Sequence, residues 1–318
     1  MVNMLDIHWS PKNNMKMMDF VKFYNNIKVD DYVDKTTSLA YHYTSPDGLS
    51  GIINNQTLRF TDRFYLNDKS EGVYVLNLCL ENINHFDFLD DTFRNVFVAK
   101  CEERLKNPQR DRFYVYQCSL STEKDSLCLW NYYTKADGIK GYNIEIDLNN
   151  ISENIVLNPY DKERVPKLRF GKIIYDTDQQ KEILKELVKK FYEYNKTDAI
   201  SGEHFVCEYL VDKIMYLGVF FKMDCFKAES EFRLVYDLFL NEDGTYAVIK
   251  DEQKFYEKNG IFIPYIDIKF RENIITGIGI SPTLDYEATK ESVLRMTARN
   301  YSKIKNDTIY ESKIPVRY

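Results

Sequence analysis

The chain has 318 residues, of which 44% are hydrophobic and 29% charged, and its formal net charge is −6. These values are those of an ordinary soluble globular protein, and they exclude a strongly basic chain that attracts nucleic acid through its overall field. The length predicts one elaborated domain or two closely associated ones. We expect an N-terminal arm and helix over residues 1–38, followed by a single α+β domain over residues 39–318.

The cysteines and the apolar runs predict a cytoplasmic protein. The six cysteines form no C-x-x-C pair and have no histidine at ligand spacing, which favours free thiols over disulfides or a metal site. The N-terminus lacks the basic and apolar regions of a signal peptide. No run reaches the roughly 18–20 apolar residues that a membrane span needs. We therefore expect neither a metal nor a membrane partner.

Hydrophobic periodicity predicts helices and strands in alternation along the chain. Helices are expected at 18–24, after Ser45, from about 70 to 83, and at 92–106, 125–134, 177–191, 201–221 and 281–299. Strands are expected at 39–44, 57–60, 113–119, 142–147, 168–175, 231–236, 246–249, 262–270 and 274–280, with a last strand ending over 312–318. This order predicts an α+β fold with mixed or antiparallel sheets and surrounding helices.

Several local signals predict where these elements begin. Ser45 and Ser281 each precede a proline, which is the arrangement of an N-cap followed by the first helical residue. Thr177 opens a capping box with Gln180. The loop at 64–71, with Asn67 and Asp68, and the run 241–244 carry the residues that turns favour.

The first polar concentration is His42 with Thr44, at the end of the first expected strand. The two-residue period of a strand places both side chains on one face. The helix that begins after Ser45 presents free N–H groups, which favour anions. The pattern fits a ligand site, but this stretch alone favours a structural histidine beside a helix cap.

The second polar concentration is Glu229, Glu231 and Arg233, at the start of an expected strand. Glu229 and Glu231 share one side of an extended segment, and their repulsion favours protonation of one unless a cation lies between them. One interpretation is a Glu–Arg ladder on a sheet face. The other is a rigidly held carboxylate that stabilises positive charge in a transition state.

A set of motifs in fixed order resembles a known family. The motifs are Tyr41-His42-Tyr43-Thr44-Ser45, Leu66-Asn67-Asp68 with Ser70-Glu71, Cys118-Ser119 with Asp125-Ser126-Leu127 and Trp130-x-x-Tyr133, Gly141-Tyr142, Phe226 with Glu229-Ser230-Glu231-x-Arg233, and Ser312-Lys313-Ile314-Pro315. Together they resemble the bacterial family catalogued as domain of unknown function 2971, from about residue 39 to the C-terminus. That family is itself remotely similar to the ADP-ribosyltransferase superfamily.

The resemblance implies an ADP-ribosyltransferase-like core that takes NAD as substrate. By this likeness, His42 and Thr44 bind the adenosine ribose, and Glu231, with Glu229 before it, acts at the nicotinamide ribose. The middle motif is either the Ser-x-Ser that begins at Ser119 or one of two aromatic residues, Tyr133 and Tyr142. For the diphosphate, donors come from the helix start at Ser45 or from Arg59.

Two functions from different classes follow. The first is an NAD-dependent ADP-ribosyltransferase or NAD glycohydrolase, acting as a toxin or phage-defence effector, with a small-molecule nucleotide and a protein or nucleic-acid acceptor as partners. The second is a catalytically silent ligand- or protein-binding module on the same fold. The first requires that His42, Glu231 and an aromatic residue from 130–142 line one cleft. The second is favoured if Arg233 neutralises Glu231 away from any pocket.

Overall fold

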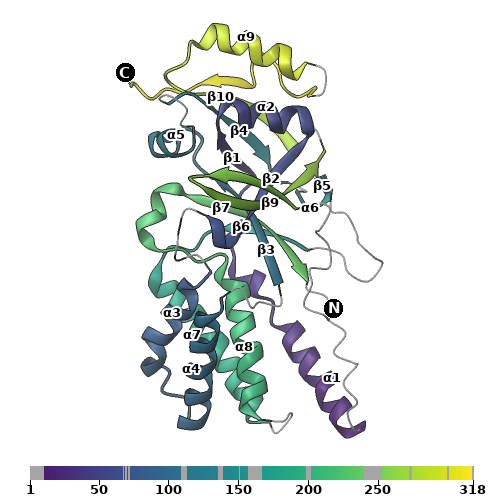
Figure 1. Cartoon of the computed structure of the whole chain (residues 1–318), viewed down its shortest axis with the longest axis vertical. Helices are drawn as coiled ribbons and strands as arrows, with labels where there is room; N and C mark the ends of the chain where they lie inside the picture. The colour runs from purple at the N-terminus through teal and green to yellow at the C-terminus, as the bar shows by residue number, and fades with distance from the viewer. Residues whose placement is uncertain are drawn as a thin grey trace.

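A mixed sheet runs through the middle of the molecule, with helices packed on both sides of it (Figure 1). The computed structural model describes residues 11–66, 68, 70, 72–108, 113–134, 139–149, 151–156, 167–197, 202–239, 253–271, 274–298 and 301–316. In Figure 1 the helices α1, α3, α4, α7 and α8 lie below the sheet, α9 lies above it, and α2 lies level with the upper strands β4 and β10. The class is α+β, as the sequence predicts.

Eleven strands of the described residues form one sheet, in the order β11-β10-β4-β1-β3-β2-β9-β5. Strand β7 pairs with β3 and β6, and β8 pairs with β9. The pairings are antiparallel except that of β10 with β11. The strands are β1 (Leu39–Thr44), β2 (Thr57–Asp62), β3 (Phe113–Ser121), β4 (Tyr142–Asp147), β5 (Ile155–Val156), β6 (Lys167–Lys172), β7 (Glu231–Phe239), β8 (Lys254–Lys258), β9 (Ile261–Phe270), β10 (Ile275–Ile280) and β11 (Ile309–Glu311).

The helices occupy most of the regions that the sequence assigns to them. The α-helices are α1 (Pro11–Asn26), α2 (Pro46–Asn55), α3 (Tyr74–Asn82), α4 (Asp91–Lys106), α5 (Leu127–Tyr133), α6 (Ile151–Asn154), α7 (Thr177–Asn195), α8 (Glu203–Gly218) and α9 (Tyr286–Thr297). Short 3-10 helices are η2 (Val29–Tyr32), η3 (Arg63–Tyr65), η4 (Ile83–His85) and η5 (Asp224–Glu229). The expected turn at 241–244 and strand at 246–249, and Asn67 in the 64–71 loop, lie outside the described residues.

Two predicted helix caps are wrong. Asp176, rather than Thr177, caps α7 by accepting a hydrogen bond from the N–H of Gln179 at 2.8 Å. Asp285, rather than Ser281, caps α9. Ser281 instead binds Gly141, the residue before β4. Its N–H donates to the Gly141 carbonyl, and its hydroxyl oxygen accepts from the Gly141 N–H. The serine therefore joins the sheet to the loop before α9.

Two predicted element ends also differ from the structure. Helix α3 begins at Tyr74 rather than near Ser70, because Asp68 accepts hydrogen bonds from the N–H and hydroxyl of Ser70 and holds it in a turn. The last strand ends at Glu311 and does not extend over 312–316, and residues 317 and 318 lie outside the described residues. Ser312 leaves the sheet because its hydroxyl donates to a loop carboxylate, that of Asp125, at 2.6 Å.

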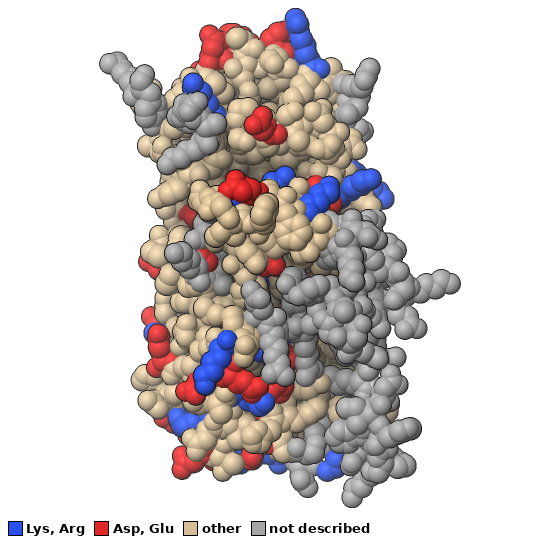
Figure 2. All heavy atoms as spheres, in the orientation of Figure 1, with Lys and Arg blue, Asp and Glu red and all other residues tan. Residues whose placement is uncertain are grey.

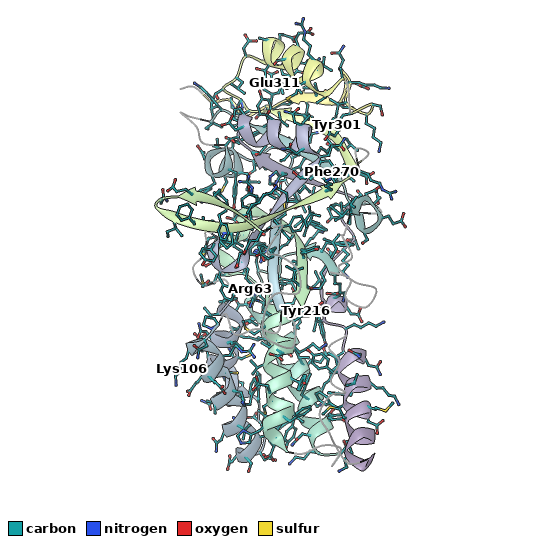
Figure 3. The ribbon with its side chains drawn as sticks, turned by 45° about the vertical axis from the view of Figure 1, so that its right-hand side comes forward. Arg63, Lys106, Tyr216, Phe270, Tyr301 and Glu311 are labelled. Carbon is teal, nitrogen blue, oxygen red and sulfur yellow. The ribbon has the colours of Figure 1, made fainter. Side chains whose placement is uncertain are left out.

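Two large apolar clusters cover the opposite faces of the central strands. Strand alternation on β7 sends Val235 into the cluster shared with α3, α4, α7 and α8. It sends Leu234 and Tyr236 into the cluster shared with α2 and α9. In Figure 3, Lys106 lies among the helices below the sheet and Glu311 near the top of the molecule, with the sheet between them. A smaller cluster that includes Tyr43 and Trp130 holds α5 against β1.

The N-terminal helix shares the core of the main body. Phe20 of α1 is fully buried and makes edge contacts with Tyr194 of α7 and with Phe205 and Tyr209 of α8. The division of the chain at residue 38 stays a prediction. Within the described ranges, no helix combines the length and the apolar character needed to cross a bilayer. All six cysteines are free thiols.

A buried lysine joins α8 to the segment that follows α1. The ammonium of Lys213 donates to the carbonyl of Ile27 at 3.1 Å and lies 3.8 Å from the centre of the Tyr24 ring. Burial, with a contribution from the charge of Lys167, lowers the pKa of Lys213 to about 8. Folding therefore releases a proton at any pH between this value and the ordinary lysine pKa of 10.5.

We predict that the free energy of unfolding rises, because of Lys213, as the pH increases from about 8 to 10.5. In this window the unfolded chain binds the proton that the folded chain has lost, so a higher pH favours the folded state. The measurement is chemical denaturation at both ends of the window for the wild type and Lys213→Met. The wild type should gain stability relative to the variant, and parallel pH profiles would contradict the buried, deprotonating lysine.

Candidate functional site

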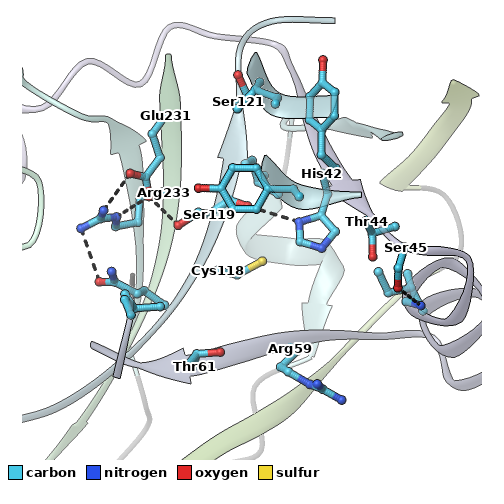
Figure 4. A pocket seen from close by; sticks show the side chains of 18 of the residues that line it. His42, Thr44, Ser45, Arg59, Thr61, Cys118, Ser119, Ser121, Glu231 and Arg233 are labelled. Carbon is cyan, nitrogen blue, oxygen red and sulfur yellow. Dashed lines mark hydrogen bonds and ion pairs between the residues drawn. The ribbon is translucent and has the colours of Figure 1, made fainter. Parts of the chain in front are cut away.

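A cavity of about 560 Å³ lies where the ends of β1, β3 and β7 meet α2, α5 and the β8–β9 hairpin (Figure 4). This volume is typical of sites for small molecules and cofactors. The cavity brings together residues as far apart in the chain as Tyr41 and Asp267. The sequence-predicted site residues in its lining are His42, Thr44, Ser45, Arg59, Ser119, Tyr133, Glu229 and Glu231.

Tyr142 is the predicted site residue that the cavity leaves out. It lies on β4, where it pairs with Thr44, and its ring packs against the cluster under α2 and α9. Tyr133, at the end of α5, reaches the cavity instead. Of the two aromatic candidates for the middle motif, the geometry therefore favours Tyr133.

His42 is a neutral histidine with a defined orientation. Its Nδ1 lies 3.2 Å from the carbonyl oxygen of Ser119, and this contact requires Nδ1 to carry the proton. Burial lowers the pKa of His42, while the bond to the Ser119 carbonyl opposes that shift. The ring therefore presents Nε2 as a hydrogen-bond acceptor.

The start of α2 borders the same cavity. Ser45 caps the helix, as the sequence predicts, by accepting a hydrogen bond from the N–H of Gly48 at 3.1 Å. A Cβ atom at Gly48 would lie 2.0 Å from the Thr44 hydroxyl, so only glycine lets this strand end and helix start approach so closely. Thr44 and the helix N-terminus consequently sit together beside His42 (Figure 4).

Glu231 is a fully engaged, buried carboxylate. Arg233 binds it through both oxygens at 2.7 and 2.8 Å, Ser119 donates to Oε1 at 2.5 Å, and Lys222 lies 3.2 Å from Oε2. These contacts use the four lone-pair positions of a carboxylate, and its side chain is 2% exposed. Burial alone raises the pKa of Glu231, but the charges of Arg233 and Lys222 outweigh it and hold the pKa well below its usual range.

Glu229 is the more accessible of the two carboxylates, with 18% of its side chain exposed. Lys222 donates to its Oε2 at 2.6 Å, and the hydroxyl of Tyr133 donates to its Oε1 at 3.2 Å. Burial, together with the charges of Glu229 and Glu231, raises the pKa of Tyr133 far above 10. The tyrosine therefore remains a hydrogen-bond donor to Glu229 at neutral pH.

Lys222 is the site residue that the sequence reasoning missed. It is buried, and its ammonium lies between Glu229 and Glu231. Burial lowers the pKa of Lys222, but the two carboxylates reverse the shift and keep the lysine charged. A signal was present, because a single lysine ends the apolar run Phe220–Phe221 seven residues before Glu229. The spacing alone does not show that the chain turns between Lys222 and Glu229 and so brings the two side chains into contact.

Another cationic side chain, that of Arg59, lies at a different part of the cavity. Arg59 is an exposed residue of β2, and its guanidinium lies 4.0 Å from the centre of the Tyr265 ring and 5.0 Å from that of Tyr256. Figure 4 shows Arg59 on the side of Thr44 and Ser45, apart from the Glu231–Arg233 pair. Stacking on both rings fixes the direction of the guanidinium.

The described residues offer no metal centre, because nowhere among them do three His, Cys, Asp or Glu side chains gather closely enough to hold an ion. On the face shown in Figure 2, acidic and basic side chains intermingle. The cavity, rather than a metal or a basic face, is the candidate site.

Comparison with known families gives one match. A model described as a protein of unknown function (DUF2971) matches residues 129–234. This stretch contains Tyr133, Lys222, Glu229 and Glu231, and it supports the family expected from the sequence motifs over that part of the chain. The searches of curated proteins and of solved structures returned no match.

We predict that Asp125 stabilises the wall of the cavity formed by α5. Its carboxylate accepts hydrogen bonds from Trp130 Nε1 at 2.7 Å, from the Ser312 hydroxyl, and from the Lys313 N–H at 2.8 Å. Asp125→Ala leaves the indole N–H of the buried Trp130 without this acceptor. It should lower the free energy of unfolding by about 1–2 kcal/mol.

The measurement is urea denaturation. Glu193→Ala is the matched control, because its carboxylate is 63% exposed and its ion pair with Lys189 is long, at 3.8 Å. The control should change stability by less than about 0.5 kcal/mol. Equal effects of the two substitutions would contradict a structural role for Asp125.

Proposed function

We propose that the chain binds NAD in this cavity and cleaves the bond between its nicotinamide and ribose. The observation that carries the proposal is that His42, Tyr133 and the Glu229–Glu231 pair line one cavity although they are distant in sequence. The resemblance of the sequence motifs to the ADP-ribosyltransferase superfamily supports NAD as the nucleotide. The activity is then that of an ADP-ribosyltransferase or an NAD glycohydrolase.

The two parts of the cavity suit the two parts of a dinucleotide. On one side, neutral His42 offers Nε2 to a ribose hydroxyl, and Arg59 with the N-terminus of α2 offers positive charge to the diphosphate. On the other side, Glu229 is partly exposed beside Tyr133. A carboxylate there can accept a hydrogen bond from the nicotinamide ribose.

The reaction breaks the C1′–N bond, and the bonding electron pair leaves with neutral nicotinamide. Positive charge develops on the ribose ring, as it does in glycoside cleavage. A carboxylate bonded to a ribose hydroxyl stabilises that charge. A nucleophile then forms a bond to C1′ and releases its proton, and this nucleophile is water in a glycohydrolase or a protein or nucleic-acid acceptor in a transferase. Depletion of NAD is a suitable activity for a toxin or phage-defence effector.

A second candidate function is nucleotide binding without cleavage. The observation that favours it is the complete engagement of Glu231 by Arg233, Ser119 and Lys222. A carboxylate in this state is an acceptor for protein donors, which leaves chemistry to Glu229 alone. If Glu229 is also only an ion-pair partner of Lys222, the cavity holds a ligand without transforming it.

We predict that NAD binds the wild-type protein and that free nicotinamide accumulates. At about 100 times its dissociation constant, NAD should raise the free energy of unfolding by roughly 2.7 kcal/mol. His42→Ala should weaken binding about tenfold, because one hydrogen bond to the ribose is lost. The measurements are thermal unfolding, titration calorimetry and chromatographic detection of nicotinamide.

His85→Ala is the matched control, since His85 lies in η4 and outside the cavity lining. It should leave NAD binding unchanged. Binding without nicotinamide release would favour the silent module over the enzyme. Absence of NAD binding would contradict the proposed cleavage of NAD.

A further inference from the structure

We propose that the two carboxylates have separate tasks: Glu229 contacts the substrate, Glu231 is a structural ion, and Lys222 is the positioning residue that holds Glu229. This assignment rests on the proposed function and deepens it. The motif resemblance alone gives the substrate role to Glu231, so the contacts lead to a different residue.

The carboxylate of Glu231 is fully hydrogen-bonded within the protein. Each of its oxygens already accepts from two protein donors, and its side chain is 2% exposed. A ribose hydroxyl could bond to it only by displacing Arg233, Ser119 or Lys222. Removing one partner of such a buried pair leaves the other charge uncompensated, which is unfavourable. Glu231 therefore has no acceptor position left for a substrate.

Glu229 lies where a substrate can reach it. Its side chain is nine times more exposed than that of Glu231, at 18% against 2%, and it lies in the cavity lining. Its backbone is nevertheless fixed, because its carbonyl accepts from the Ser121 hydroxyl at 2.7 Å and the next carbonyl, of Ser230, accepts from the Thr122 N–H at 2.9 Å. The side chain of Glu229 is therefore accessible from the cavity, while its backbone is held in place.

Lys222 orients the carboxylate of Glu229. Its backbone carbonyl accepts from Gln180 Nε2 at 2.9 Å, and its N–H donates to the Ile174 carbonyl. These two hydrogen bonds hold the backbone of Lys222 in place. Its ammonium, over the Phe226 ring at 4.7 Å, holds Glu229 Oε2 at 2.6 Å. With Tyr133 on Oε1, two donors set the direction of the carboxylate. Lys222 acts on the substrate through Glu229.

The charges in this part of the cavity also balance in pairs. Arg233 compensates Glu231, and the ammonium of Lys222 supplies a second positive charge between the two carboxylates, 2.6 Å from Glu229 and 3.2 Å from Glu231. The hydrogen bonds of Lys222 and Tyr133 leave Glu229 with further lone pairs, unlike Glu231. The substrate class this suits is a ribosyl group with a free hydroxyl beside the carbon that becomes positive.

The decisive experiment compares Glu229→Gln with Glu231→Gln. Glu229→Gln should keep its Tm within a few degrees of wild type and bind NAD with a dissociation constant within about threefold. Its rate of nicotinamide release should fall by a factor of about 10²–10³. Glu231→Gln should instead lower Tm by on the order of 10 °C, since Arg233 and Lys222 lose a buried counter-ion. If this variant cannot be isolated folded, that result also agrees with its structural task.

Lys222 is tested with Lys222→Met and Lys222→Arg. Lys222→Met should lower kcat at least tenfold with KM for NAD changed less than about threefold, and Lys222→Arg should restore part of kcat because it retains a donor and a charge. A purely structural lysine would lower stability in both variants without separating kcat from KM.

Three results would overturn the proposal. Glu229→Gln with turnover close to wild type excludes Glu229 as the substrate contact. A folded, stable Glu231→Gln without turnover returns that task to Glu231. A wild-type protein that binds NAD and releases no nicotinamide refutes the cleavage reaction and hence a catalytic Glu229, while the loss of stability in Glu231→Gln would still establish its structural task.

Discussion

The pairing of β3 with β7 is the constraint on which both the core and the cavity depend. Its register sets Leu120 opposite Phe232 in the apolar core, and it sets Ser121 opposite Glu231 on the cavity face. A slip of one residue would reverse every side chain of a strand, so it would bury the charged row among apolar residues. The register of two neighbouring strands therefore fixes the core and the carboxylate together.

The same row of charges extends from the cavity into the helical side of the molecule. Beyond the Glu231–Arg233 pair, Asp237 of β7 binds the buried Arg169 of β6 through both carboxylate oxygens. Buried charges of this kind are costly when one partner is lost, and they contribute little net stability when complete. Their value here is geometric, because they fix the directions of β6 and β7. A rigid β7 in turn gives a fixed position to Glu229, which lies two residues before the strand begins.

Local signals in the sequence predict the parts of the site that local structure determines. Strand alternation is enough to put His42 and Thr44 on one face and to identify Arg233 as the partner of Glu231. Lys222 was missed because its neighbours are set by the turn through η5 and by the bridge to Ile174, which are tertiary features. For the same reason the sequence left Tyr133 and Tyr142 as alternatives, since only the packing of α5 decides between them.

The cavity combines two stretches of chain that differ in their relation to the family model. Residues 129–234, which the model matches, supply Tyr133, Lys222 and both carboxylates. His42 and Arg59, which lie outside the match, supply the opposite side of the cavity. Under the proposed function, the groups assigned to bond cleavage and those assigned to nucleotide binding thus come from separate segments. On that proposal, substitution of His42 or Arg59 should change how tightly the ligand binds, whereas substitution of the cavity residues within 129–234 should change what happens to it.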